Sequence, residues 1–261
     1  MNKKILLIVE GEKAEPKIFK KLLSEYTLDF EIYCFGTNIY SLYKIMKDND
    51  FNVNIKDILI ELQPEQRDIL SNTFVYTYLI FDLDPHHTKK DDSRTIEEIV
   101  KDNIIKVKKM AEYFIDETDP TIGKLYINYP MMESYKDCDS TFDENYAFKT
   151  TKLSDIKGYK NIVSTRKMSN IRIDKYQKSD FSNLIAQNIY KLNYIFSKNW
   201  GKLKYESYLS LSEAKNLLNK QSEIINENQF VFVINTSLFI VVDYFGNKNS
   251  FYDNLFKKLT L

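Results

Sequence analysis

The stretch YLIFDLDPHH, residues 78–87, ends an apolar run with two aspartates that are one residue apart. The run itself, FVYTYLIF (74–81), is rich in aromatic and β-branched side chains and predicts a buried strand. Residues i and i+2 of a strand face the same way, so Asp82 and Asp84 can direct both carboxylates to one point. Two such carboxylates repel one another unless a cation lies between them, and a divalent metal ion is the usual solution. The alternative is that one aspartate caps the next turn while the other is solvated.

The segments around this strand alternate between strand and helix patterns. An uninterrupted aliphatic run, KILLIV (4–9), predicts a central parallel strand that is covered on both faces. The remaining patterns predict a helix with Pro16 at its first position, a strand over 30–35, an amphipathic helix from Ile39 to Met46, an irregular acidic connection, a helix over 95–114 and a strand over 124–128. This alternation indicates an α/β domain of Rossmann-like type, with a mainly parallel central sheet, over residues 1–140.

Acidic residues also follow the first predicted strand. Glu10 ends it, Gly11 permits a tight turn, and Glu15 opens the following helix. Ligands of open α/β sheets gather beyond the carboxyl ends of the strands. If the first and third strands are neighbours, Glu10 and Asp82 lie side by side, and the carboxylates line one crevice. Glu15 is explained equally well as a favourable negative charge at a helix N-terminus.

Residues 141–261 differ from the first part in composition and pattern. We expect a mostly helical, Lys-rich accessory region that binds substrate or a partner. The segment FSNLIAQNIYKLNYIF (181–196) has the spacing of an amphipathic helix, and Ser210 with Glu213 forms a capping-box pattern before a further helix. Residues 149–220 contain 15 Lys and Arg against 5 Asp and Glu, although the whole chain balances 37 basic against 37 acidic residues. This local excess of positive charge is notable because the chain as a whole has no net charge.

The basic stretch 149–220 is the candidate nucleic-acid surface. Lysine and arginine attract phosphates, and aromatic rings such as Tyr159 and Tyr176 can stack on unpaired bases. The candidate contact residues are Arg166, Lys167, Arg172, Lys175 and Lys178. Two alternatives stay open: this is a solvated helical surface, or the basic region packs against the acidic one.

Cysteine usage and apolar run lengths bear on the compartment. Cys34 and Cys138 lie far apart without metal-type spacing, which favours reduced thiols. The longest apolar stretch, FVFVINTSLFIVV (230–242), is interrupted by polar residues and is shorter than the roughly 20 residues that a membrane-spanning helix needs. We therefore expect a cytoplasmic protein without a membrane partner.

The motifs around Glu10 and Asp82 resemble those of a known protein family. A strand followed by Glu-Gly, with a later strand followed by Asp-x-Asp, resembles the Toprim domain of topoisomerases, bacterial primases and OLD-type nucleases. VEGEKAEPKIF (9–19) resembles the RloB-like branch in particular, and so does INYPMMES (127–134), where Asn128, Pro130 and Glu133 form an N-x-P-x-x-E element. A small Toprim protein is also similar to the effectors of anti-phage systems of the PARIS type. The resemblance covers residues 4–135. It departs from the pattern at Ala14, where the branch has Thr, and at the Pro-His-His of residues 85–87.

The resemblance implies metal-dependent cleavage of phosphodiester bonds with Mg²⁺ or Mn²⁺. In this interpretation the catalytic residues are Glu10, Asp82 and Asp84, and the metal ligands are Glu10, Glu15, Asp82, Asp84 and Glu133. Auxiliary positions are Gly11, His86, His87 and Asn128. Either histidine could protonate the leaving oxygen or contact phosphate; the alternative for both is a polar turn after the strand.

The same resemblance implies nucleic acid as substrate: RNA, tRNA in particular, or DNA. It also implies a toxic effector that is restrained by a partner, such as an ATPase sensor subunit encoded nearby, or by homo-oligomer formation. A different class stays open, in which the chain is a non-catalytic nucleic-acid- or partner-binding subunit of a defence complex. Haloacid-dehalogenase-type phosphatases and GT-A glycosyltransferases share the Asp-x-Asp motif. The phosphatases carry it on their first strand, followed by Gly-Thr or a similar pair, whereas here it follows the third strand and precedes Pro-His-His. The glycosyltransferases give no role to Glu10-Gly11.

Overall fold

The computed structural model describes residues 4–88, 92–139, 141–166, 170–246 and 250–257. The chain divides into two compact units, Met1–Tyr126 and Ile127–Leu261, and each is described by itself. The domain boundary predicted from the sequence is near residue 140, which is later than this division. The reason is that residues 127–132 hydrogen-bond within the second unit. Tyr129 pairs with Ile234, and the Thr236 hydroxyl donates to the Ile127 carbonyl at 2.8 Å.

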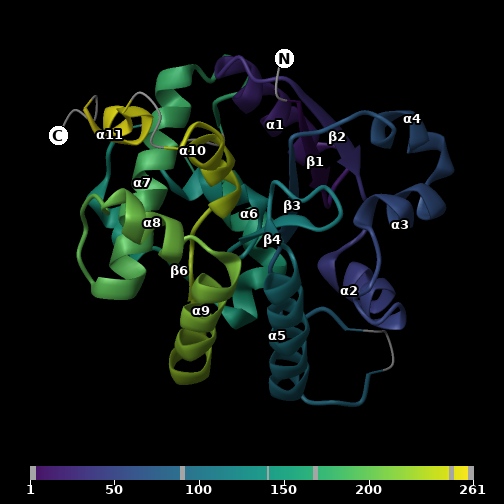
Figure 1. Cartoon of the computed structure of the whole chain (residues 1–261). Coiled ribbons are helices and arrows are strands. Elements are labelled where there is room, and N and C mark those ends of the chain that lie inside the picture. The colour runs from purple at the N-terminus through teal and green to yellow at the C-terminus, as the bar shows by residue number, and fades with distance from the viewer. Residues whose placement is uncertain (1–3, 89–91, 140, 167–169, 247–249, 258–261) are drawn as a thin grey trace. The chain divides into compact units, whose positions relative to one another are not determined.

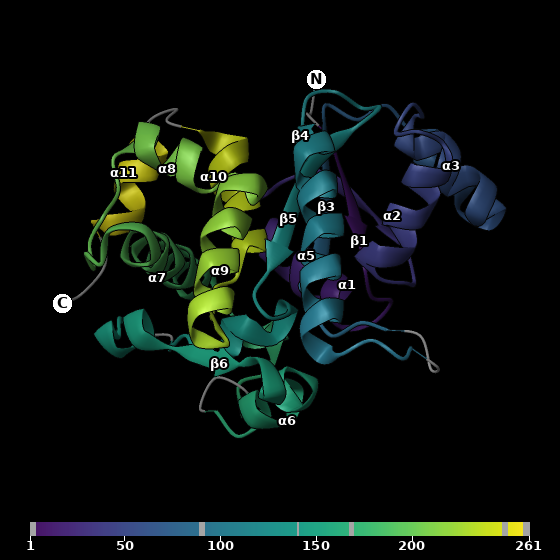
Figure 2. The ribbon, with the colours of Figure 1, turned by 90° about the horizontal axis from the view of Figure 1, so that it is seen from below.

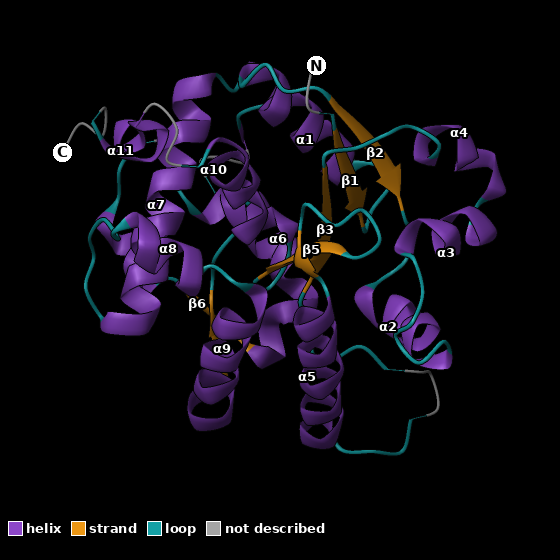
Figure 3. Cartoon of the chain, in the orientation of Figure 1, coloured by secondary structure: helices purple, strands orange, loops and turns teal. Residues whose placement is uncertain are grey.

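The first unit is built on a five-stranded, mostly parallel sheet with the order β2-β1-β3-β5-β4 (Figure 3). Its strands are β1 (Ile5–Val9), β2 (Phe30–Cys34), β3 (Tyr76–Asp82), β4 (Ile115–Asp116) and β5 (Gly123–Asn128). β1 pairs in parallel with both β2 and β3. Every residue of β1 is buried, as its uninterrupted aliphatic sequence predicts. The prediction of an α/β fold with a mainly parallel sheet is therefore confirmed.

The helices of the first unit follow the predicted alternation, with two differences. They are α1 (Ala14–Glu25), α2 (Ile39–Asp48), α3 (Ile55–Leu62), α4 (Arg67–Leu70) and α5 (Ile96–Tyr113). The connection before β3 is not irregular, because it contains α3, which Asn54 caps by accepting from the Lys56 amide at 2.9 Å. Pro16 is the third residue of α1 rather than the first. A proline is tolerated there because the first helical N–H groups lack partners in the helix. α2 and α5 lie side by side (Figures 1 and 2).

The second unit is largely helical and includes one small sheet. Its helices are α6 (Tyr159–Ser164), α7 (Lys178–Ser197), α8 (Tyr205–Leu211), α9 (Ala214–Asn228), α10 (Ile240–Phe245) and α11 (Phe251–Phe256), and β6 (Thr150–Lys152) pairs antiparallel with β7 (Phe230–Phe232). The predicted capping box is wrong. Ser210 lies inside α8, and Glu213 precedes α9 without a side-chain cap hydrogen bond. Among the described residues, no helix has both the length and the apolar character needed to span a membrane.

Candidate active site

Glu10 and Asp82 meet at one edge of the first unit's sheet. In the parallel pairing of β1 with β3, Val9 lies opposite Ile80, so both strands end at the same edge of the sheet and β3 runs two residues further than β1. The Asp82 amide donates to the Glu10 carboxylate, with a distance of 3.1 Å from N to Oε2. The two strands are thus neighbours, as the side-by-side arrangement requires. We call Glu10, Gly11, Glu15, Asp82 and Asp84 the acidic edge.

Gly11 is required by space rather than by an unusual backbone conformation. A Cβ added at this position would lie 2.8 Å from Cδ of Glu15, because the Glu15 carboxylate folds back over the glycine. Gly11 has no positive φ of the kind that favours glycine. The first turn of α1 therefore brings Glu15 against the Glu10-Gly11 segment, and the acidic edge gains another carboxylate.

Asp84 combines the two roles that the sequence leaves open. Leu83 is fully buried, whereas Asp82 and Asp84 on either side of it are partly exposed, as the i, i+2 pattern predicts. The Asp84 carboxylate also accepts from the His86 amide at 3.3 Å, and its carbonyl accepts from the His87 amide at 3.1 Å. Asp84 therefore caps the following turn while it contributes charge to the edge.

Tyr40 is a member of this site that the sequence patterns do not reveal. Its hydroxyl is buried and makes no hydrogen bond with any residue in the described ranges. Burial raises the pKa of this hydroxyl well above its ordinary value, and the negative charges of Asp84 and Glu10 raise it further. Both carboxylates therefore act on one buried hydroxyl. In the sequence, Tyr40 belongs to the apolar face of a helix, and nothing in that pattern distinguishes it from a core residue.

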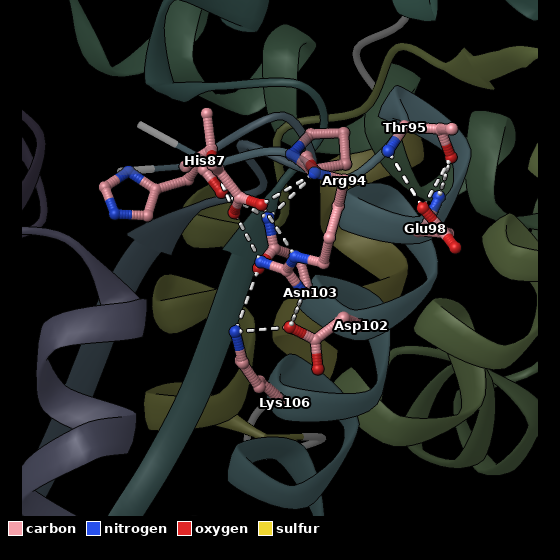
Figure 4. Close-up of polar contacts among 10 residues, drawn as sticks. His87, Arg94, Thr95, Glu98, Asp102, Asn103 and Lys106 are labelled. Atoms are coloured by element: carbon pink, nitrogen blue, oxygen red, sulfur yellow. Dashed lines mark hydrogen bonds and ion pairs between the residues drawn. The ribbon is translucent and has the colours of Figure 1, made fainter. Parts of the chain in front are cut away.

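His87, in the turn after β3, is held by an aromatic ring and by hydrogen bonds. The His87 ring stacks on Tyr40, with ring centroids 5.0 Å apart and planes 6° apart. Its Nδ1 lies 3.3 Å from the side-chain nitrogen Nδ2 of Asn38, the residue that caps α2. Asn103 of α5 donates to the carbonyls of Pro85 at 2.9 Å and His87 at 2.7 Å (Figure 4). The turn after β3 is therefore held from both α2 and α5. Its polar character agrees with the turn interpretation, and the roles of His86 and His87 toward phosphate stay predictions.

Asn128 and Glu133 belong to the second unit, where hydrogen bonds fix their segment. The Asn128 side chain accepts from the Ser237 amide at 3.2 Å, and Asn235 donates to the Met132 carbonyl at 2.7 Å. Glu133 is 7 % exposed; Oε1 pairs with Lys160 at 2.9 Å, and Oε2 is buried with no hydrogen bond from the residues described. The sequence patterns do not reveal the anchoring residues Asn235 and Ser237.

The basic stretch is arranged differently from its prediction. Tyr159 and Tyr176 are each 1 % exposed, so they cannot stack on bases. Arg166 donates from Nε to the Asp137 carboxylate at 2.9 Å, and Arg172 pairs with Asp174 at 3.0 Å. Lys175 and Lys178 lie at the start of the α7 region, and Lys167 is outside the described residues. The nucleic-acid role of these side chains stays a prediction.

Within the described ranges, no three His, Cys, Asp or Glu side chains come together as a group that could hold a metal ion by itself. Comparisons with family models, with curated proteins and with solved structures found no match to this chain. The function of this chain is therefore inferred from the acidic edge and from the sequence resemblance.

Proposed function

We propose that this chain is a metal-dependent nuclease of Toprim type, which hydrolyses phosphodiester bonds of RNA or DNA at the acidic edge. One observation carries the proposal: the Glu10 carboxylate lies 3.1 Å from the Asp82 amide, at the shared end of β1 and β3. This juxtaposition unites two motifs that are 72 residues apart in the chain. It occurs at the strand ends, where α/β sheets bind their ligands.

The residues of the acidic edge fit a magnesium ion whose remaining ligands come from outside the protein. Mg²⁺ is usually held by one or two carboxylates, and it keeps several waters or takes phosphate oxygens. A complete three-residue cage is therefore not needed. We assign Asp82 and Asp84 as the main ligands, with Glu10 and Glu15 beside them. When bound, the metal would polarise the phosphate and lower the pKa of an attacking water.

The protein's own residues have separate tasks in this proposal. Asp84 is oriented by the His86 amide, so its carboxylate has a defined direction. Glu10, held by the Asp82 amide, is positioned to accept a proton from water as a general base or to serve as a ligand. The Tyr40 hydroxyl stays protonated, because burial and the negative charges of Asp84 and Glu10 raise its pKa.

The test compares cleavage of RNA and DNA by the wild type, Asp82→Asn, Glu10→Gln and Glu12→Gln in Mg²⁺ or Mn²⁺. Glu12 is a matched control because it lies in the same turn and is exposed. We expect both edge variants to lose at least about a hundredfold in cleavage rate, since even the residues that merely support metal ligands contribute tenfold to a hundredfold. Glu12→Gln should cleave as the wild type does.

Cleavage that persists in EDTA, or that survives in Asp82→Asn, contradicts the proposal. From the resemblance we also propose that the chain is an anti-phage effector restrained by a partner, with tRNA as its main target. The assay is therefore run with and without the products of neighbouring genes, and the cut ends are sequenced. A wild type that binds nucleic acid but never cuts, even with those partners, supports the non-catalytic subunit instead.

A further inference from the structure

A cavity of about 550 Å³ lies in the first unit between α2, the β3–α5 connection and α5. Binding sites for small organic molecules have volumes of roughly 300–1,000 Å³, so a mononucleotide is of suitable size. Its lining combines the rings of Tyr40 and His87 with the cations Lys44, Lys47, Arg94 and Lys106, and the carboxylates Asp48 and Asp92 line it as well. Of these residues, Tyr40 also belongs to the candidate active site described above.

One wall of the cavity is aromatic and rigid. Tyr40 and His87 are stacked almost parallel, with planes 6° apart. The position of His87 is fixed by the Asn103 side chain, which donates to its carbonyl at 2.7 Å. Asn103 is itself 1 % exposed. A flat aromatic surface of this kind is a suitable stacking partner for a nucleobase, because every base has a π-face.

The cations around the cavity fall into two groups. Arg94 is bound by Asp102 at 2.8 Å and also by Asp92, and Lys106 is bound by Asp102 at 2.7 Å, so their charges are matched (Figure 4). Lys44 and Lys47, by contrast, form no ion pair with any residue that the structure describes. They are one turn apart on α2, and both line the cavity. Two unmatched ammonium groups beside an aromatic wall suit a ligand that combines a base with a phosphate.

Tyr40 connects this cavity with the acidic edge. Its ring lines the cavity and stacks on His87, while its hydroxyl lies where the charges of Asp84 and Glu10 raise its pKa.

We propose that this cavity binds one unpaired nucleotide of a nucleic-acid strand, with its base on the Tyr40–His87 wall and a phosphate at Lys44 and Lys47. A paired base cannot enter, so the ligand is a single-stranded segment or a nucleotide turned out of a helix. That this strand is the one cleaved at the acidic edge rests on the proposed function. The binding site itself does not.

The test measures binding of AMP, GMP, CMP and UMP by calorimetry in EDTA, with ribose 5-phosphate and inorganic phosphate as probes that lack a base. At least one nucleotide should bind about tenfold more tightly than ribose 5-phosphate, because stacking adds to the phosphate contacts. The double variant Lys44→Ala/Lys47→Ala should weaken nucleotide binding by about tenfold or more, since hydrogen bonds to charged groups are the strong ones. The matched control is Lys101→Ala/Lys108→Ala, which removes two exposed lysines of α5 that do not line the cavity, and it should bind as the wild type does.

The proposal is overturned if no nucleotide binds more tightly than ribose 5-phosphate, or if the Lys44/Lys47 double variant binds nucleotides as well as the wild type. The same titration with Asp82→Asn, and with the 2′-deoxynucleotides, separates this proposal from the nuclease. Nucleotide binding without any cleavage by the wild type would refute the nuclease and leave the cavity as a binding site. Cleavage without nucleotide binding would refute the binding site and leave the nuclease proposal intact. Tighter binding of ribonucleotides than of their deoxy forms would identify RNA as the preferred strand.

Discussion

The acidic edge and the basic stretch 149–220 differ in what determines the positions of their charged side chains. At the acidic edge, Glu10 and Asp82 are brought together by the backbone, because β1 and β3 are paired in parallel and end at the same edge of the sheet. In the basic stretch, several cationic side chains are used inside the second unit. Lys191 has no exposed surface, and its ammonium group donates to the carbonyls of Tyr146, Ala147 and Lys149 at 2.8 Å each.

The difference shows what kind of charge pattern locates a site. A carboxylate at the end of a buried strand has a position that the sheet dictates, since all parallel strands end toward the same edge. A basic residue in a helical, Lys-rich segment can point outward or can satisfy buried groups. Arg166 supports the buried Asp137 and Lys191 supports three carbonyls, so the excess of positive charge overstates the charge available to a partner.

The largest effect that we expect in the basic stretch distinguishes an arginine that pairs with a buried carboxylate from one whose pair is exposed. Arg166→Ala should lower the free energy of unfolding by roughly 1–3 kcal/mol, because it removes a charged partner from a buried carboxylate. The Asp137 side chain is only 3 % exposed, and it keeps a hydrogen bond from Tyr159. Arg172→Ala is the matched control: its side chain is 81 % exposed, so its loss should change stability by less than about 0.5 kcal/mol. Urea denaturation measures both, and equal losses would show that the two arginines are not used differently.

The sequence was sufficient for the four longer strands of the sheet and for the position of Glu10 and Asp82 at strand ends, but it did not predict the two-residue β4. The runs that end in Glu10 and Asp82 are long and apolar, so strand type and burial follow from local pattern. The sequence could not predict that β1 pairs with β3, because strand order depends on tertiary packing. The start of α1 was misplaced by two residues, since a proline is compatible with any position in the first turn.

Other features could not be read from the sequence because they arise from long-range contacts. Tyr159 and Tyr176 look available in a basic segment, but packing and the bond from Tyr159 to Asp137 bury them. Tyr40 and His87 are 47 positions apart, and only the fold stacks their rings. Short helices such as α3 lack the length at which periodicity becomes distinct.

A smaller effect on stability, but a larger one on activity, is expected at the acidic edge from Gly11→Ala. The new methyl group displaces the Glu15 carboxylate, which is the far end of a flexible side chain, so unfolding should change by less than about 1 kcal/mol. If Glu15 contributes to the metal site, Gly11→Ala should lose as much cleavage activity as Glu15→Gln. Gly158→Ala is the control, because a Cβ there meets nothing within 4 Å. Full activity in Gly11→Ala would remove Glu15 from the proposed ligands.

The smallest effect concerns the exposed cations of the basic stretch. In an Asp82→Asn background, which prevents cleavage, Arg172→Ala/Lys175→Ala should weaken nucleic-acid binding a few-fold, and similarly for different sequences. Each phosphate contact that is lost reduces the slope of log affinity against log salt by about 1, so the double variant should reduce it by about 2. Lys152→Ala/Lys157→Ala removes the same charge from exposed positions of the stretch outside the proposed surface, and it controls for net charge. If both double variants have the wild-type slope, the nucleic acid does not touch Arg172 or Lys175. The cations that contact phosphate would then have to be sought elsewhere, first at Lys44 and Lys47.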